Sequence, residues 1–111
     1  MMKYLTLPVL ALMQLQAMQY DLQFENDRVR VIRVVLDPHE KVGLHRDALQ
    51  QIVVGLKGGT VTRLEADGRE VDVVFPTGQA VYRPIDPEGE YHEGVNASDE
   101  ELELIIVQLK D

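Results

Sequence analysis

Residues 60–75, TVTRLEADGREVDVVF, contain the pattern that decides the fold prediction. Two strand-like runs, 60–66 and 69–75, flank the dipeptide Asp67-Gly68. Asp and Gly both tolerate a positive φ angle, and a two-residue hairpin turn of matching twist needs that angle at both of its central positions. This stretch therefore predicts two antiparallel β-strands joined by a tight turn.

The same signals recur along most of the chain. Short apolar or alternating runs are separated by turn residues, and no window repeats with the period of a helix. Besides the hairpin, the expected strands cover residues 20–25, 28–36, 52–56, 79–83, 91–95 and 101–110. In the last run the alternation changes phase at Val107 and Leu109, which predicts a bulge or burial of both faces. Short strands in this number are typical of a β-sandwich or β-barrel.

Size and charge limit the possible functions. A chain of 111 residues, 45% of them hydrophobic, corresponds to one ordinary globular domain. The formal charge of -8 gives a surface that repels phosphate backbones, so we expect no nucleic-acid partner. Because the chain contains no cysteine, a metal would have to be held by His, Asp, Glu or Gln.

Residues 1–19 form an apolar segment before the barrel domain expected at 20–111. The run from Tyr4 to Met13 resembles a short secretion signal, but Pro8 interrupts it. We therefore favour a retained arm that joins two copies into a homodimer. The run is too short to span a bilayer. We expect a cytoplasmic protein, with a secreted or periplasmic location left open.

The chain contains three histidines, His39, His45 and His92. Residues two apart in a strand share a face, so His45, Asp47 and, without a bulge, Gln51 would line one wall of a pocket. If the strand with His92 pairs beside this one, two imidazoles and a carboxylate meet. That set suits non-haem Fe(II), Mn and Zn, and we expect a divalent ion such as Fe, Mn, Ni or Zn as the cofactor.

At these residues the sequence resembles the cupin family. The second cupin motif, Pro-x-Gly-x-x-His-x-x-x-Asn, is present in full as Pro87, Gly89, His92 and Asn96. The first motif is present in part. Where the family has His-x-His, Glu and Gly, this chain has His45, Asp47, Gln51 and Gly58. The resemblance covers about residues 26–110 and implies an antiparallel double-stranded β-helix, the jelly-roll barrel of cupins.

Carried over onto this sequence, the cupin metal-ligand positions become His45, Asp47, Gln51 and His92. Moving the carboxylate from the third position to the second leaves the formal ligand charge unchanged. However, Gln is a poor ligand for a divalent transition ion, and Asp is shorter than His. The resemblance leaves two alternatives open, a metal centre and a metal-free pocket in which His45 bonds the backbone.

Cupin membership does not choose a reaction. Our leading expectation is a cupin that binds a small organic ligand, with a divalent metal and dioxygenase- or isomerase-like activity. The alternative is a metal-free, ligand-binding or structural homodimer without catalysis. Acid-base catalysis by His45 and Asp47 without a metal is a third possibility. Tyr82, Arg83 and Tyr91 are candidate contacts for an anionic ligand in the barrel mouth.

Overall fold

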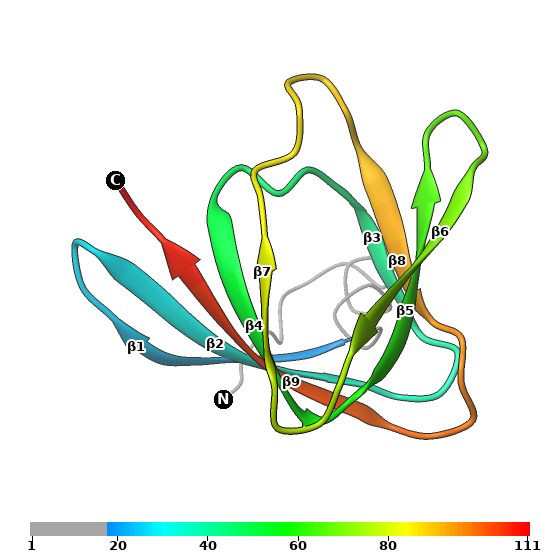
Figure 1. Cartoon of the computed structure of the whole chain (residues 1–111), viewed down its shortest axis with the longest axis horizontal. Helices are drawn as coiled ribbons and strands as arrows, with labels where there is room; N and C mark the ends of the chain where they lie inside the picture. The colour runs from blue at the N-terminus through cyan, green and yellow to red at the C-terminus, as the bar shows by residue number, and fades with distance from the viewer. Residues whose placement is uncertain (1–17) are drawn as a thin grey trace, which may run out of the picture.

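The computed structural model describes residues 18–111, and this part of the chain is built from two antiparallel β-sheets (Figure 1). Its strands are β1 (Gln19–Glu25), β2 (Val29–Leu36), β3 (Lys41–His45), β4 (Gln50–Lys57), β5 (Gly59–Glu65), β6 (Glu70–Phe75), β7 (Ala80–Arg83), β8 (His92–Asn96) and β9 (Leu102–Leu109). The larger sheet has the order β1-β2-β9-β4-β7 and the smaller one β3-β8-β5-β6. The predicted all-β class is confirmed, and no helix of residues 18–111 has the length and hydropathy to cross a membrane.

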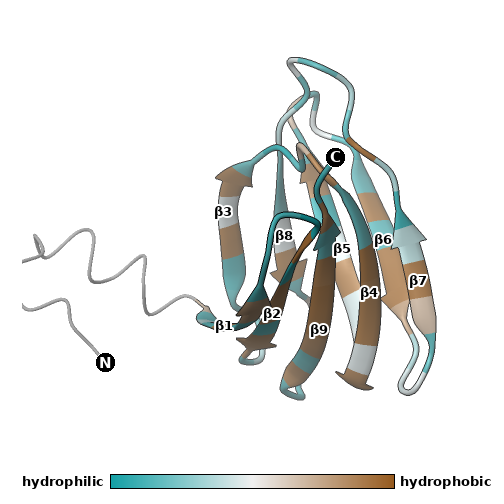
Figure 2. Ribbon diagram, turned by 90° about the vertical axis from the view of Figure 1, so that its left-hand side faces the viewer, coloured by the Kyte–Doolittle hydropathy of each residue, from teal (hydrophilic) through white to brown (hydrophobic). Residues whose placement is uncertain are grey.

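The two sheets enclose one apolar core. β9 lies between β2 and β4, and β8 lies between β3 and β5, so strands far apart in the sequence become neighbours. Figure 2 shows the hydrophobic residues concentrated on β2, β9 and β4. The buried core residues are Val34, Leu36, Val53, Phe75, Leu102 and Leu104. Burying each of these side chains stabilises the fold by about 1.5–3 kcal/mol, so the core holds the barrel closed.

The predicted phase change in β9 is not a bulge. β2 and β9 pair without a register shift from Val29 opposite Leu109 to Leu36 opposite Leu102. Val107 and Leu109 therefore simply belong to the outer face of the sheet, where both are half-buried. Of the two predicted alternatives, partial burial of both faces is the one that the structure shows.

The hairpin predicted from residues 60–75 is confirmed, but its turn is wider than expected. β5 pairs with β6 from Gly59 opposite Phe75 to Leu64 opposite Glu70. The turn hydrogen bond runs from the Gly68 amide to the Glu65 carbonyl over 3.0 Å, which places Ala66 and Asp67 at the central positions. Within this turn only Gly68 has a positive φ, 93°, so the turn is followed by a glycine in the left-handed region and is not a two-residue loop.

Of strand β3, only the last residue, His45, was expected in a strand, and that strand was expected to continue to Gln51. Its pairing with β8 shifts register between Val42, opposite Gly94, and His45, opposite His92. A bulge of this kind inserts one extra residue, so side chains three apart come to face the same side. Both Val42 and His45 line the interior cavity as a result. Because of the bulge, inward-facing and outward-facing side chains of β3 do not alternate strictly, and this alternation is the pattern by which a strand is recognised in a sequence.

Asn96 is the last residue of the second cupin-like motif. It anchors the C-terminal end of β8, whereas His92 lies at the N-terminal end of the same strand. The Asn96 side chain is fully buried, with 0% of its surface exposed. The amide nitrogen donates to the carbonyl oxygens of Leu36, Asp37 and Glu100 over 3.1, 3.2 and 2.8 Å. The amide oxygen accepts from the backbone and the hydroxyl of Ser98. One side chain thus joins the ends of β2, β8 and the turn before β9.

Candidate metal centre

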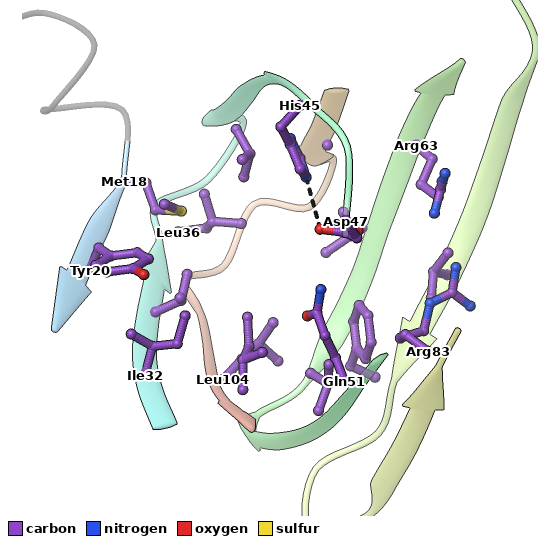
Figure 3. Close-up of a pocket in the computed structure, with 18 of the residues that line it drawn as sticks. Met18, Tyr20, Ile32, Leu36, His45, Asp47, Gln51, Arg63, Arg83 and Leu104 are labelled. Atoms are coloured by element: carbon purple, nitrogen blue, oxygen red, sulfur yellow. Dashed lines mark ion pairs between the residues drawn. The ribbon is translucent and has the colours of Figure 1, made fainter. Parts of the chain in front are cut away.

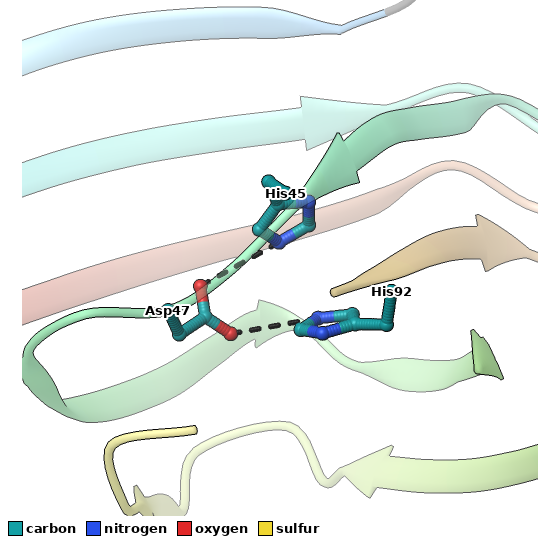
Figure 4. A group of neighbouring side chains, drawn as sticks. All are labelled: His45, Asp47 and His92. Carbon is teal, nitrogen blue, oxygen red and sulfur yellow. Dashed lines mark ion pairs between the residues drawn. The ribbon is translucent and has the colours of Figure 1, made fainter. Parts of the chain in front are cut away.

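The structure brings His45, Asp47 and His92 together at one end of the barrel (Figure 4). One ligand atom from each side chain lies within 4.8 Å of the others. The two imidazole rings are register partners on β3 and β8, with centroids 4.4 Å apart. The Asp47 carboxylate lies between them, with one oxygen 3.5 Å from Nε2 of His45 and the other 3.5 Å from Nε2 of His92.

Two loops tied to each other hold Asp47 in this position. The Asp47 amide donates to the Asp86 carboxylate over 2.8 Å, and the Asp86 amide donates to the Asp47 carbonyl over 2.9 Å. The Arg46 guanidinium donates to the carbonyl oxygens of Asp86 and Pro87. Asp86 is itself 7% exposed. The β3–β4 and β7–β8 loops, which lie close together in Figure 1, are therefore joined into one hydrogen-bonded rim.

His45 is held in the tautomer that a metal requires. Its Nδ1 lies 2.7 Å from the Gly43 carbonyl oxygen. A carbonyl can only accept, so Nδ1 carries the proton; Nε2 then has a free lone pair in the neutral ring and donates to Asp47 in the protonated ring. The hydrogen bond to the Asp47 carboxylate is the largest influence on the pKa of His45 and raises it above the ordinary value; burial opposes this, and the Gly43 carbonyl adds to it.

The pKa of the Asp47 carboxyl is shifted in the opposite direction. Burial alone would raise this pKa, but the hydrogen bond and charge of His45, together with smaller effects of His92 and Gln51, hold it below the ordinary value. Asp47 is therefore ionised near neutral pH. Two imidazoles and one carboxylate carry a formal charge of -1, which suits a divalent transition ion.

His92 faces two competing partners. Its Nδ1 lies 3.0 Å from Nη2 of Arg63 and 3.3 Å from Oδ2 of Asp86. When Arg63 donates to Nδ1, the ring proton stands on Nε2 and faces Asp47; when Nδ1 instead donates to Asp86, Nε2 is free for a metal. Burial lowers the pKa of His92, and the positive charges of Arg63 and His45 lower it further.

The pKa shifts predict a measurable order of protonation. In metal-free protein followed by NMR, His45 is expected to titrate above about 6.5 and His92 below it. The folded state then holds the His45 proton above the unfolded pKa, so this imidazole stabilises the fold at low pH and loses that contribution as the pH rises through the folded pKa. Asp47→Asn should bring the His45 pKa back toward its ordinary value. An unchanged His45 titration in this variant would contradict the assigned cause.

The remaining predicted residues take different places. Gln51 is 7% exposed, lies on β4 in the opposite sheet, and points toward Asp47 in Figure 3. The prediction that His45, Asp47 and Gln51 share one strand is wrong, because β3 ends at His45 and Asp47 lies in a loop. All three nevertheless line the same cavity.

Of the three candidate ligand contacts, Arg83 lines the cavity and the two tyrosines are absent from its lining. The hydroxyl of Tyr82 donates to Oε1 of Gln50 over 2.8 Å. Tyr82 alternates with Arg83 along β7, so it points to the outer face of the sheet. Tyr91 is 47% exposed.

The candidate metal ligands stand at the polar end of an apolar cavity of about 270 Å³ (Figure 3). Most of its wall consists of aliphatic and aromatic side chains from both sheets, among them Ile32, Val34, Val53, Val61, Val73, Phe75, Leu104 and Ile106. A concave apolar space with a few converging polar groups is the usual form of a small-molecule site.

Neither a model of a known protein family nor a curated protein matches this chain in sequence. Solved structures do match it. A cupin domain from Bordetella pertussis shares 26% identity over 85% of this chain and 94% of its own length, with a TM-score of 0.74. This chain has the cupin fold. The resemblance seen in the second motif is thereby confirmed at the level of the whole domain.

Two further solved structures that match this chain have named activities. A sugar phosphate isomerase of the cupin superfamily from Silicibacter pomeroyi shares 15% identity over 96% of this chain and 68% of its own, with a TM-score of 0.64. A polyketide cyclase from Streptomyces resistomycificus shares 19% identity over 86% of this chain and 67% of its own, with a TM-score of 0.61. At these identities the likeness concerns the fold alone.

Sequence reasoning missed three residues at the polar end of this cupin-fold domain, Arg46, Arg63 and Asp86. Asp86 stands between Pro84 and Pro87 in a loop whose restricted backbone was recognised. This position in a conformationally restricted loop could have identified Asp86 as a candidate site residue. Arg63 comes from β5 and reaches His92 only through the pairing of β5 with β8, which no local pattern reveals.

Proposed function

We propose that this cupin binds one divalent transition ion through Nε2 of His45, Nε2 of His92 and the Asp47 carboxylate. The observation that carries the proposal is the convergence of these three ligand atoms within 4.8 Å at the polar end of an apolar cavity. Fe, Mn, Ni and Zn all accept imidazole and carboxylate ligands. Gln51, across the cavity, would supply a weaker neutral oxygen.

We further propose that the cavity takes a small organic ligand and that the ion assists chemistry on one of its oxygen atoms. The ion would supply Lewis acidity, or O2 activation if it is iron. The chain itself would contribute an ionised Asp47, which the rim loops keep from moving, and an apolar wall that excludes water. Isomerase-like and dioxygenase-like reactions both fit these parts, and the named activities of the similar structures show that this fold hosts catalysis.

One observation favours a metal-free binding protein as the second candidate. Asp47 already contacts both imidazoles, and Nη2 of Arg63 lies 3.0 Å from Nδ1 of His92, where a hydrogen bond from Arg63 would leave the ring proton on Nε2 and block metal binding. No buried side-chain polar atom among residues 18–111 lacks a hydrogen-bond partner. The polar end is therefore satisfied by the protein alone.

Elemental analysis of protein purified without chelator distinguishes the two candidates. The metal proposal expects close to one Fe, Mn, Ni or Zn per chain in the wild type and its loss in His92→Ala. Metal at trace level in wild-type protein that has been offered each of the four ions would remove the proposal and leave the metal-free binding protein.

We propose that two copies associate through β1. Among the described strands, it is the edge of the larger sheet and pairs only with β2. All seven of its residues are exposed, including Tyr20, Leu22 and Phe24 at 50%, 56% and 54%. An open edge with large apolar side chains is a ready surface for a second copy related by two-fold symmetry. The predicted arm, residues 1–19, lies outside the described residues except for Met18 and Gln19.

Leu22→Glu is accordingly expected to convert a dimer into a monomer, because the charge would be buried against the partner. Val74→Glu is the matched control, since Val74 on β6 is 57% exposed at the edge of the other sheet. Light scattering after size-exclusion chromatography measures the mass of each. A monomeric wild type, or a Leu22→Glu variant that stays dimeric, would refute association through β1.

A further inference from the structure

Arg83 is a cation in the cavity wall that the proposed metal centre does not use. It lies on β7 opposite Gln51 of β4, and both side chains line the cavity. Figure 3 shows Arg83 on the same side of the cavity as Gln51 and Arg63, away from Met18 and Tyr20. Within residues 18–111, the Arg83 guanidinium makes no ion pair and no hydrogen bond. A partly buried cation without a partner favours an anion from outside the chain.

The other cavity arginine, Arg63, is already neutralised. Its Nε lies 3.0 Å from the Glu65 carboxylate, and its Nη2 lies 3.4 Å from Asp86 and 3.0 Å from Nδ1 of His92. These partners use most of the guanidinium donors. The two cavity arginines therefore have different roles, Arg63 within the polar end and Arg83 toward the ligand space.

The charge balance of the cavity limits the anion to a weakly charged one. Asp47 also lines this cavity, the buried Asp86 lies beside its polar end, and the chain has a formal charge of -8. Among the described residues that line the cavity, Arg83 has the only unpartnered guanidinium, and one guanidinium matches one carboxylate in a pair of parallel hydrogen bonds. A phosphate carries more negative charge, which a single guanidinium would leave partly unbalanced.

We propose that the ligand of this pocket is a small organic monocarboxylate, with its carboxylate on Arg83 and its apolar body against the Val53, Val73 and Phe75 wall. The proposal rests on the proposed function only in taking the same cavity as the ligand site. It names the substrate class and assigns Arg83 as the residue that selects it.

The test uses metal-free protein, so that a carboxylate cannot bind through an ion. Phenylacetate, 4-methylpentanoate and butanoate are each compared with their neutral amides, and binding is followed by NMR titration of the backbone amides. At least one of the carboxylates is expected to bind about tenfold to a hundredfold more tightly than its amide, the range expected when a charged hydrogen bond is gained. Arg83→Gln should abolish this preference, and Arg83→Lys should reduce it because the two-pronged geometry is lost.

Arg28→Gln is the control, since Arg28 is exposed and absent from the cavity lining. Circular dichroism verifies that each variant is folded. Equal binding of acids and amides, no binding of any of the three acids, an unchanged preference in Arg83→Gln, or equal affinity for inorganic phosphate would overturn the proposal. Because no metal is present, the outcome is independent of the elemental analysis, and either proposal can fail alone.

Discussion

His92→Ala is expected to weaken the binding of a divalent transition ion by at least about a hundredfold, since loss of even an outer-shell partner of a metal ligand costs 10–100-fold. The substitution removes one of the two imidazoles and leaves Asp47 facing a single ring across 3.5 Å. A competition titration against a coloured chelator, with Zn or Mn as the ion, measures the affinity. This is the largest effect on binding that we expect from one side chain.

His39→Ala provides the matched control for this variant. His39 is an exposed histidine in the turn before β3, where Nε2 lies 2.9 Å from Asp99. Its removal changes the histidine content by the same amount without touching the polar end of the cavity. The assignment of His92 as a ligand would be wrong if both variants bound the ion equally well.

Asn96→Ala is expected to produce the largest loss of stability, about 3 kcal/mol or more, because several buried hydrogen bonds are lost and buried carbonyl groups are left unpaired. For a domain of this size such a change lowers Tm by roughly 12 °C or more. The affected carbonyls belong to Leu36, Asp37 and Glu100, so the ends of two strands and a turn lose their common anchor. Urea denaturation gives the free energy of unfolding, and calorimetry gives Tm.

Asn26→Ala is the comparison that isolates burial as the cause. The Asn26 side chain also accepts two backbone hydrogen bonds, from Arg28 and Val29, but in an exposed turn. Its removal should cost about 1 kcal/mol, as for an ordinary capping residue. If the two asparagine variants lost the same free energy of unfolding, the buried hydrogen bonds of Asn96 would not stabilise the fold more than exposed ones do.

Much of the barrel could be predicted from the sequence because its signals are local. The turn at Gly68, the restricted loop that contains Pro84 and Pro87, and the alternation of β9 each depend on residues close together in the chain. Most of β3 escaped prediction because its bulge breaks the alternation between Val42 and His45. The shape of the hairpin turn also differed, because the hydrogen bond formed one residue earlier than the Asp67-Gly68 pair suggested.

The sequence could predict which residues belong to the candidate site, but it could not predict how they are arranged in space. The spacing of Pro87, Gly89, His92 and Asn96 identified both the imidazole that faces the cavity and the asparagine at the far end of the same strand. Alternation along one strand could not show why His45 and Asp47 converge with His92. The cause is the hydrogen bonding between the β3–β4 and β7–β8 loops, which are about 40 residues apart in the chain. Similarly, alternation places Tyr82 and Arg83 on opposite faces of β7, but only the pairing of Arg83 with Gln51 of β4 tells which of the two faces the cavity.

The most direct test of the metal proposal is an anomalous difference map from a crystal of the protein loaded with Zn or Mn, recorded at the absorption edge of that ion. The proposal predicts one peak bonded to Nε2 of His45, Nε2 of His92 and a carboxylate oxygen of Asp47, at the roughly 2.0–2.2 Å typical of such ligands. It also predicts that Nδ1 of His92 donates to Asp86 and no longer accepts from Arg63. A map without a peak between the two imidazoles, in crystals that contain the ion, would contradict the metal centre.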